Sequence, residues 1–380
     1  MRTIGKVDVF PIRVPAREAL RFASGSAGVA GELVPLVLVR VTDSEGCTGW
    51  GECRPMPQWA YETAETVVST IRRHLAPALL GLAASDRWGL QRRMQEVIGR
   101  GPSPGQPIAK AALDIAVHDL CARTAGLPLR CLLGGALERR TVHLSFTVTA
   151  HDAAAAAEQV RAARRHGYRH FNFKVAVAPD TDREVAEAVR EAGGPDAFCW
   201  ADANQGCSLP SALRLADGLA EAGINLFEQP FPADRPHLLA QLRGRCRVPL
   251  AVDEASVGAA DFFTYAREGL VDYLVLKLTR SAGIWPSLQQ LAIAEAAGLP
   301  FVVSGLTDGL LGRAAACQVA AAYGGEGPAA LNGGQFLDET PLYAAARIES
   351  GGSVQLPDTA GLGIEPEEEL VREVLDPELS

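Results

Sequence analysis

Polar and apolar side chains alternate along GYRHFNFKVAV, residues 167–177, as they do in a β-strand. Asn172 and Lys174 fall on one face of this predicted strand, and Phe171 and Phe173 fall on the other. A surface strand with one solvated face has this pattern. A barrel strand also has it, when its outer face packs on helices and its inner face reaches an active site. The alternation alone allows both interpretations.

From residue 140 onward, short apolar runs alternate with Ala-, Arg- and Glu-rich stretches of helical character. Eight strand–helix units over roughly 200 residues are typical of a parallel (β/α)8 barrel. The last run, ALNGG, is the weakest of the eight. The predicted strands are 142–148, 169–177, 197–203, 224–230, 249–255, 273–278, 300–305 and 330–334.

The chain before and after these runs has a different character. Residues 1–55 predict strands with a hairpin-like turn at 43–46, and residues 60–130 predict helices. After residue 340 the sequence predicts a loop followed by a short acidic helix. We therefore predict an N-terminal α+β domain, a barrel and a C-terminal segment. Their predicted limits are 1–130, 131–337 and 338–380.

The net charge narrows the range of partners. The 380 residues include 36 Lys and Arg against 45 Asp and Glu, a formal charge of −9. We therefore expect the protein to bind neither nucleic acid nor an anionic membrane. The eight cysteines form no C-x-x-C pair, the N-terminus has no apolar signal core, and no run of 18 apolar residues occurs. These features predict a reduced, cytoplasmic protein.

Charged side chains occur at the C-terminal ends of five consecutive predicted strands, where barrel enzymes place their active sites. Each is separated from the next by about 25 residues, the length of one strand–helix unit. The five strands would therefore bring their charges to the same rim of the barrel. The residues are Lys174, Asp202, Glu228, Asp253 and Lys277.

The three acidic residues of this series predict a metal site. Carboxylates that converge on one rim repel each other, and a divalent cation relieves the repulsion. Hard oxygen ligands favour Mg²⁺, and Mn²⁺ is the alternative. A single Asp or Glu is more often a helix cap or a surface ion pair. Three at this register, each behind apolar residues, favour a metal centre made of Asp202, Glu228 and Asp253.

Lysine is rare in this chain, which makes its positions informative. The lysines are Lys6, Lys110, Lys174 and Lys277, and all other basic residues are arginine. Arginine does not release a proton near neutral pH, whereas burial and the field of a cation can lower a lysine pKa enough for it to act as a base. Strands two and six lie opposite each other in an eight-strand ring. Lys174 and Lys277 would then flank a carboxylate substrate and remove its α-proton through an enediolate, unless they only form salt bridges to rim acids. We assign no chemistry to Lys6 or Lys110.

Several motifs occur in a fixed order along the chain. They are Asn172-Phe173-Lys174, Asp202-Ala203-Asn204, Phe227-Glu228-Gln229-Pro230, Val252-Asp253-Glu254 and Lys277, with GWGE (49–52), AKAALDIAVHDL (109–120), PLRCLLGG (128–135) and PDTAGLGIEPEEE (357–369). Together they resemble the enolase superfamily, specifically its muconate-lactonizing-enzyme subgroup, over essentially the whole chain. The resemblance implies a modified TIM barrel, (β/α)7β, with an N-terminal α+β capping domain that the C-terminal tail completes. It also implies Mg²⁺ ligation by the three acids and acid/base roles for Lys174 and Lys277.

The resemblance also implies surroundings for this centre. Asn204 would lie beside the metal. Independently of the resemblance, a contact with Asp253 or Glu254 is expected to orient Lys277. The loops near 20–31 and 54–62 would close over the substrate, with Trp59 as a candidate for its apolar pocket. Ser304, at the end of the seventh strand, is a further candidate for substrate contact or support.

Asn172 departs from the subgroup, which usually carries Lys-x-Lys at this position of the second strand. A second ammonium group would lower the pKa of Lys174 by repulsion, whereas Asn172 supplies an amide that could hydrogen-bond the substrate. The sequence also lacks the His-Asp dyad of the mandelate-racemase type, which counts against acid-sugar dehydration.

The expected substrate is a small carboxylate, and the overall reaction is left open. Two opposed lysines favour a racemase or epimerase of an N-substituted or proline-like amino acid. A muconate-type cycloisomerase or a hydroxyproline-type dehydratase would use the same metal and lysines. A Schiff-base aldolase with Lys277 as nucleophile and a non-catalytic metal-binding barrel are more distant alternatives. We also expect a homo-oligomer, since barrels of this kind often assemble symmetrically.

Overall fold

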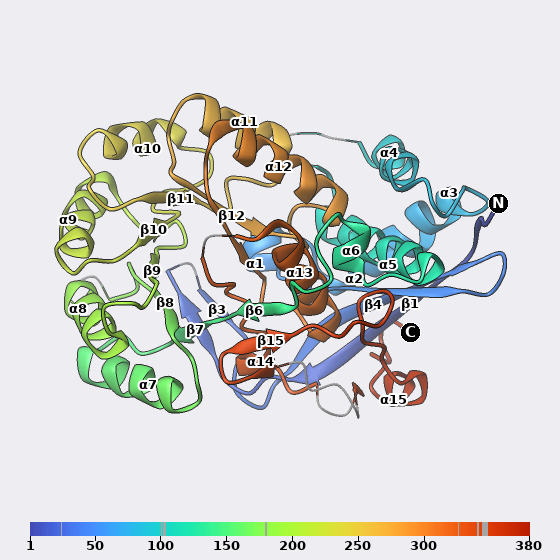
Figure 1. Cartoon of the computed structure of the whole chain (residues 1–380), viewed down its shortest axis with the longest axis horizontal. Coiled ribbons are helices and arrows are strands. Elements are labelled where there is room, and N and C mark those ends of the chain that lie inside the picture. Colours follow the sequence, from blue (N-terminus) through green and yellow to red (C-terminus); the bar gives the residue numbers. More distant parts are fainter. Residues whose placement is uncertain are drawn as a thin grey trace.

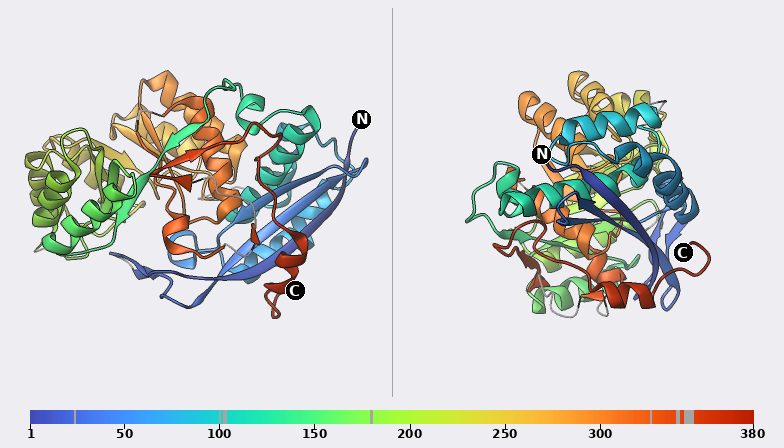
Figure 2. Two further views of the ribbon diagram at one scale, coloured as in Figure 1. Left: turned by 60° about the horizontal axis from the view of Figure 1, so that its bottom comes forward. Right: turned by 90° about the vertical axis from the view of Figure 1, so that its right-hand side faces the viewer.

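The computed structural model describes residues 1–23, 25–99, 101, 104–178, 181–325, 327–339, 342–343 and 349–380. It contains a curled parallel sheet surrounded by helices, and an antiparallel sheet packed on a second set of helices (Figure 1). The chain begins and ends beside the antiparallel sheet (Figure 2). The architecture is therefore an α/β barrel with a capping domain, as the sequence predicted.

The barrel sheet has seven strands: β7 (Ser145–Val148), β8 (His170–Lys174), β9 (Cys199–Asp202), β10 (Leu226–Glu228), β11 (Leu250–Val252), β12 (Tyr273–Lys277) and β13 (Phe301–Ser304). They are hydrogen-bonded in the order β13-β12-β11-β10-β9-β8-β7, with every pair parallel. The eighth predicted strand is reduced to two bridging residues. Ala329 bridges Leu144 beside β7, and Ala330 bridges Ser304 of β13. These bridges join the two edges of the sheet.

Alternation along the strands builds the barrel interior in layers. Six apolar side chains form one buried cluster inside the sheet: Trp200, Leu226, Ala251, Val275, Val302 and Ala330. Side chains two positions apart share a face of a strand, so the residues that follow these by two also point inward. Those residues are Asp202, Glu228, Asp253, Lys277 and Ser304. We call this apolar cluster the barrel floor, and the polar side chains of the rim form the next layer above it.

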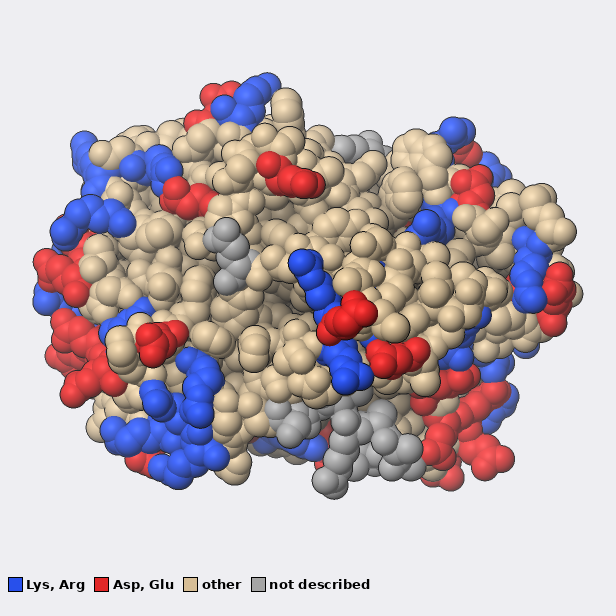
Figure 3. All heavy atoms as spheres, viewed as in Figure 1, with Lys and Arg blue, Asp and Glu red and all other residues tan. Residues whose placement is uncertain are grey.

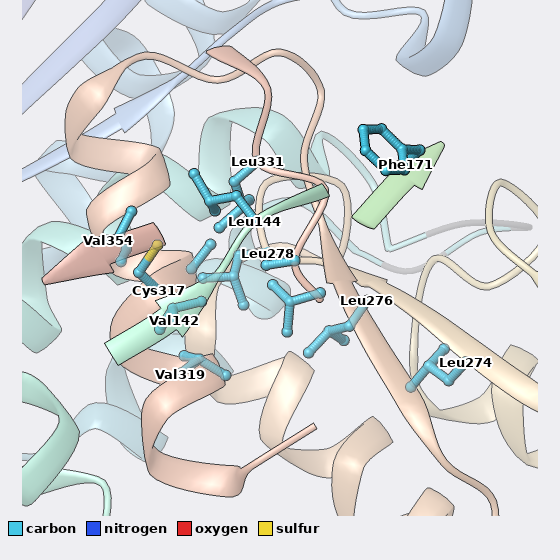
Figure 4. Packing of buried hydrophobic residues seen from close by; sticks show 14 of the residues in the cluster. Val142, Leu144, Phe171, Leu274, Leu276, Leu278, Cys317, Val319, Leu331 and Val354 are labelled. Carbon is cyan, nitrogen blue, oxygen red and sulfur yellow. The ribbon is translucent and has the colours of Figure 1, made fainter. Parts of the chain in front are cut away.

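Helices cover the outside of the barrel. They are α7 (Ala153–Arg165), α8 (Asp182–Gly193), α9 (Leu209–Glu221), α10 (Pro236–Arg243), α11 (Ala259–Arg267), α12 (Ile284–Ala297), α13 (Leu310–Tyr323) and the short α14 (Gly333–Phe336). The outward faces of the strands are buried beneath them: Phe171 and Phe173 have no exposed surface. Leu274, Leu276 and Leu278 belong to the same core cluster as Cys317 and Val319 of α13 (Figure 4).

The capping domain is built on an antiparallel sheet of β1 (Ile4–Pro15), β4 (Leu33–Asp43) and β5 (Thr48–Cys53) in the order β1-β4-β5. A separate hairpin, β2 (Leu20–Phe22) and β3 (Gly25–Ala27), follows β1. The helical elements are α1 (Pro57–Ala60), α2 (Ala64–Thr70), the π-helical turn η1 (Ile71–Leu75), α3 (Ala76–Leu79), α4 (Arg87–Val97), α5 (Pro107–Ala125) and α6 (Leu129–Leu132).

The two glycines of GWGE allow β5 to lie directly on α5. A Cβ atom at Gly51 would overlap the carbonyl oxygen of Ala112, and one at Gly49 would overlap that of Ala116. Both overlaps are with helix backbone, which cannot rotate away. Trp50, between the glycines, points the other way, and its ring packs against Phe10. The motif is therefore explained by sheet-on-helix packing.

The C-terminal segment connects the barrel to the cap. The run predicted as one strand over 142–148 divides at Leu144: β6 (Thr141–His143) pairs with the tail strand β15 (Ser353–Gln355), which also pairs with β14 (Glu349–Ser350). After α15 (Glu368–Glu373), the tail follows β1, where Arg13 N donates to Val374 O at 3.1 Å. The part of the tail at 340–341 and 344–348 lies outside the described residues.

Two acidic side chains of the cap dock on the N-termini of barrel helices. Asp114 of α5 accepts hydrogen bonds from Ile284 N and Trp285 N of α12 at 2.5 and 3.2 Å. Glu52 of β5 accepts from Leu311 N of α13 at 3.1 Å. A carboxylate at a helix N-terminus satisfies free N–H groups and complements the helix dipole. These contacts tie the cap to the two helices that follow β12 and β13.

The surface shows mixed charge. Basic and acidic side chains both occur on the face seen in Figure 3. Among the described residues, no helix has the combined length and hydropathy needed to cross a bilayer.

Replacing Gly51 with alanine should destabilise the protein, because the new methyl group must push β5 away from α5. We expect a loss of roughly 1–3 kcal/mol, the usual cost of overpacking a core, measured as a lower midpoint of urea or thermal unfolding. Gly244→Ala is the matched control, since a Cβ there meets no atom within 4 Å. An equal effect of the two substitutions would contradict the packing explanation of the motif.

Candidate active site

Three carboxylates lie at the C-terminal rim of the barrel. Asp202 ends β9, Glu228 ends β10, Asp253 follows β11, and all three are buried. Burial raises the pKa of Glu228 well above its usual range, and the negative charges of Asp202 and Asp253 raise it further. The three groups are therefore close enough to repel one another, as the sequence predicted.

Each aspartate of the rim is paired with a lysine. Lys174 Nζ lies 2.5 Å from Asp202 Oδ2, and Lys277 Nζ lies 2.6 Å from Asp253 Oδ2. The strands β8 and β12 that carry the lysines are separated by β9, β10 and β11. Both ammonium groups nevertheless lie 5.7 Å from the centroid of the Trp59 ring. The two amines thus enter one space from different strands.

The pKa of Lys277 is shifted upward, not downward. Burial is the largest single influence and acts to lower this pKa, but the combined attraction of Asp253, Glu228 and Glu254 outweighs it. Burial likewise acts to raise the pKa of Asp253, and Arg280 and Lys277 together hold it well below its usual range. In this arrangement Lys277 is an ammonium group bound to a carboxylate. It becomes a base only if another cation takes over the charge of Asp253.

Several oxygens beside the rim have no partner. Glu228 Oε2, Glu254 Oε2 and Asn204 Oδ1 are buried and accept no hydrogen bond from the described residues. Glu254 Oε1 accepts one from Asn204 Nδ2 at 2.9 Å, and burial, followed by the charges of Asp253 and Asp202, raises the pKa of Glu254 to about 7. Unpartnered carboxylate and amide oxygens are the ligand chemistry of Mg²⁺.

The residues of the rim therefore fit a divalent cation by their chemistry, although their present spacing is that of ion pairs. In the described part of the chain, no group of three or more His, Cys, Asp and Glu side chains is already arranged to hold one metal ion. The lysine ammonium groups instead supply the positive charge at Asp202 and Asp253. A cation would have to take the place of these ammonium groups on the aspartate oxygens.

Asn172 lies on the barrel floor, level with Trp200 and two residues below Lys174. Its Oδ1 accepts hydrogen bonds from Ser145 Oγ at 3.1 Å and Thr147 Oγ1 at 3.0 Å. Thr147 Oγ1 in turn accepts from Asn332 Nδ2 at 2.9 Å. The side-chain oxygen of Asn172 is thus occupied by hydrogen bonds to Ser145 and Thr147, so its amide nitrogen is the group that a ligand would contact.

Trp59 belongs to α1, and the centroid of its ring lies 5.7 Å from the amines of both Lys174 and Lys277. Its ring stacks on Phe22 of β2, with 4.2 Å between centroids, so the two cap loops meet at this point. Trp59 Nε1 is buried without an acceptor in the described residues. Tyr61, two residues on, is 60% exposed and does not share this position. Residue 24 of the loop 20–31 lies outside the described residues.

Ser304 has a supporting position. It pairs in register with Lys277, is buried, and its Oγ lies 3.5 Å from Ala330 O at the closing bridge of the barrel.

Two buried charged residues near the rim were not predicted. Arg280, three residues after Lys277, lies 2.5 Å from Asp253 Oδ1. Asp308, in the loop after β13, accepts a hydrogen bond from Thr279 Oγ1 at 3.0 Å. Both lie in irregular loops, where neither strand alternation nor the strand spacing applies. The only sequence signal was their position shortly after the end of an inward-facing strand.

Lys110, to which we assign no chemistry from the sequence, has a structural role. Its buried Nζ donates to the carbonyl oxygens of Ile98 and Pro104, both at 2.7 Å. Glu62 lies beside it and accepts from Ile108 N and Ala109 N at 2.7 and 3.1 Å. Glu62 thereby fixes the end of the loop 54–62 to the first turn of α5.

Two family models match the chain. The model of the mandelate racemase/muconate lactonizing enzyme N-terminal domain matches residues 7–134, and that of the enolase C-terminal domain-like family matches residues 154–370. The chain belongs to the enolase superfamily. Within it, the chain is 32% identical to muconate cycloisomerase 1 of Rhodococcus opacus, over 96% of both proteins. It is 29% identical to the D-Ala-D/L-Ala epimerase of Cytophaga hutchinsonii, over 95% of both.

Solved structures of other enolase-superfamily members share the whole fold. The muconate lactonizing enzyme of Pseudomonas fluorescens, complexed with muconolactone, superposes with a TM-score of 0.90 at 26% identity, over 98% of this chain and 99% of that one. The dipeptide epimerase of Cytophaga hutchinsonii, complexed with Mg and D-Ala-L-Val, gives 0.88 at 27%, over 98% of both. The N-succinyl Arg/Lys racemase of Bacillus cereus gives 0.89 at 25%, over 98% of both. These relatives are isomerases, and this enolase-superfamily chain is an enzyme.

The burial of Glu62 should make stability depend on pH. Burial raises its pKa from 4.5 to about 7, so the folded protein retains the proton over a range in which the unfolded chain loses it. Stability should therefore fall as pH rises from about 4.5 to about 7, by roughly 1.4 kcal/mol for each pH unit between these two values. Urea unfolding of wild type and Glu62→Gln across this range measures the effect. A stability difference between the two proteins that does not vary with pH would contradict it.

Proposed function

We propose that this enzyme removes the α-proton of a small carboxylate substrate in a Mg²⁺-dependent reaction, and that it racemises or epimerises an N-substituted or proline-like amino acid. The observation that carries the proposal is the pair of lysines. Lys174 and Lys277 come from β8 and β12, each bound to a different rim carboxylate, and both lie equally far from Trp59. One carboxylate substrate held between them would meet an amine from either strand.

In this proposal Asp202, Glu228 and Asp253 hold the metal ion. Relatives crystallised with Mg and a dipeptide support the choice of Mg²⁺, and Mn²⁺ accepts the same oxygen ligands. The bound ion supplies Lewis-acid chemistry, which stabilises negative charge on the carboxylate whose α-proton is removed. Asn204 and Glu254 support the ligands from the neighbouring loops.

The lysines divide the proton transfer between two faces of the substrate. A cation held by Asp253 would compensate its charge, which would weaken the interaction that keeps Lys277 protonated. One lysine then takes the α-proton and the other returns a proton from the opposite side, which inverts the configuration. Trp59 excludes water above them and offers its Nε1–H to an oxygen of the substrate.

An N-acyl substituent on the substrate nitrogen fits the protein groups that lie around the metal site and the two lysines. Trp59 and Phe22 form an aromatic cover for an apolar group. The eighth-strand segment, residues 330–334, contains no Asp or Glu that could bind a substrate ammonium group, and Asn332 Nδ2 within it is bonded to Thr147 Oγ1. The N-succinyl amino acid racemase among the structural relatives supports the same substrate class.

A muconate-type cycloisomerase is the second candidate. It is favoured by the 32% identity to muconate cycloisomerase 1 and by the structural similarity to a muconate lactonizing enzyme. It needs only one of the two lysines, which gives the test between them. The hydroxyproline-type dehydratase is distinguished by loss of water from its substrate. A homo-oligomer in the cytoplasm stays a prediction from the sequence.

Single lysine variants should lose α-proton exchange for one enantiomer of the substrate and not for the other. Lys174→Met should lose α-proton exchange in D₂O for one enantiomer by at least about 100-fold and retain it for the other. Lys277→Met should show the reverse preference. The measurement is exchange at the α-carbon, followed by NMR with N-acyl amino acids of each configuration. Lys6→Met is the control, because the Lys6 side chain is exposed and its ion pair is with Asp8 in the capping domain.

The outcomes of this experiment distinguish the candidates. If only one of the two lysine variants loses exchange, and it does so for both enantiomers, a single base acts and the cycloisomerase gains support. Undiminished exchange in both variants would remove the lysines from the chemistry.

Metal removal tests the other enzyme classes. EDTA should abolish exchange and added Mg²⁺ should restore it, because the ion stabilises the charge that develops on the substrate. Borohydride treatment with a carbonyl compound should leave the Lys277 peptide unmodified by mass spectrometry. Activity that survives EDTA together with a trapped adduct at Lys277 would indicate a Schiff-base aldolase. Mg²⁺ binding without exchange of any carboxylate in a broad panel would indicate a non-catalytic barrel.

A further inference from the structure

Arg280 carries a positive charge in the protein interior, where a charged group is energetically unfavourable. It lies in the loop between β12 and α12 and is 3% exposed. Removing a guanidinium group from water costs several kcal/mol unless it is paired. Its partner is Asp253, whose Oδ1 forms an ion pair with Arg280 Nη2 at 2.5 Å. None of Nε, Nη1 and Nη2 has a partner with hydrogen-bond geometry in the described residues. The ion pair with Asp253 is therefore the interaction that compensates the burial of Arg280.

The two oxygens of Asp253 are held by different kinds of cation. Lys277, on a long flexible stem, contacts Oδ2, and Arg280 contacts Oδ1. Asp202 has a parallel arrangement: Lys174 contacts Oδ2, and the backbone N–H of Asn204 donates to Oδ1 at 2.8 Å. In each aspartate one oxygen is therefore held by a lysine, and the other by a group that takes no part in the proposed chemistry.

The loop that carries Arg280 is fixed on both sides. Thr279 Oγ1 donates to Asp308 Oδ1, and Ser281 Oγ accepts from Gln290 Nε2 at 2.9 Å. Gln290 Oε1 accepts in turn from Ser256 Oγ at 2.8 Å. Because Ser256 lies in the loop that follows Asp253, Gln290 joins the two loops from its position on α12. The distance between Arg280 and Asp253 is thus set by buried side chains around them.

We propose that Arg280 is a positioning residue that keeps the carboxylate of Asp253 in its ligating orientation when Lys277 turns to the substrate. This inference rests on the proposed function, since it takes Asp253 as a metal ligand and Lys277 as a mobile acid/base group. Arg280 fixes Oδ1, which leaves Oδ2, the oxygen that Lys277 gives up, to face the metal. Without Arg280, the departure of Lys277 would leave the carboxylate free to rotate.

The test is Mg²⁺ affinity, measured by calorimetry without substrate. Arg280→Lys keeps the charge but loses the planar fork, so it should weaken Mg²⁺ binding by about tenfold or more, the usual effect of losing an outer partner of a metal ligand. In the exchange assay at saturating Mg²⁺, kcat should fall more than KM rises. Arg130→Lys is the matched control: Arg130 is equally buried and paired with Asp358, far along the chain from the rim, and its change should leave Mg²⁺ affinity as in wild type.

A second variant covers the case in which Arg280→Lys does not fold. Gln290→Leu leaves Arg280 in place but removes the link between the two loops, and it should weaken Mg²⁺ binding in the same direction. Wild-type Mg²⁺ affinity in a folded Arg280→Lys protein, or in Gln290→Leu if only that variant folds, overturns the inference while leaving the proposed function intact. A wild-type protein that binds no Mg²⁺ refutes the proposed function and the inference with it.

Discussion

Burial of like charges at one rim is the constraint on which the rest of the structure depends. Asp202, Glu228 and Asp253 are removed from water on adjacent strands, where an unpaired carboxylate is strongly unfavourable. Positive charge at the same rim compensates these acids: Lys174 forms an ion pair with Asp202, and Lys277 and Arg280 form ion pairs with Asp253. Such a balance of charge is useful in an enzyme. A metal ion or a substrate that binds one member of an ion pair leaves the other member available for proton transfer.

The cap is held by the same parts of the barrel that carry this chemistry. Asp114 and Glu52 dock on the N-termini of α12 and α13, the helices that follow Lys277 and Ser304. Glu62 fixes the end of the loop that places Trp59 against both lysines. The body of the cap is therefore anchored by buried carboxyl groups. We infer that any closing motion over the substrate belongs to the loops near 20–31 and 54–62.

The sequence was most informative where a strand period governs the side chain. The alternation around Lys174 and the spacing of the strand ends placed five charged residues on one rim, and the structure brings them together. It was least informative in the loops. Nothing periodic marks Arg280 or Asp308, and the caps at Asp114 and Glu52 depend on tertiary contacts between distant segments. The reduced eighth strand and the division of 142–148 likewise depend on pairing with Ala330 and with the tail. The domain limits at 130 and 337 stay predictions.

The most direct test of the account is a crystal structure of the enzyme grown with Mg²⁺ and a carboxylate ligand. The account predicts one ion with an oxygen from each of Asp202, Glu228 and Asp253 at about 2.1 Å, and the ligand α-carbon between the amines of Lys174 and Lys277. An ion bound elsewhere, or two lysine nitrogens on the same side of the ligand, would contradict it.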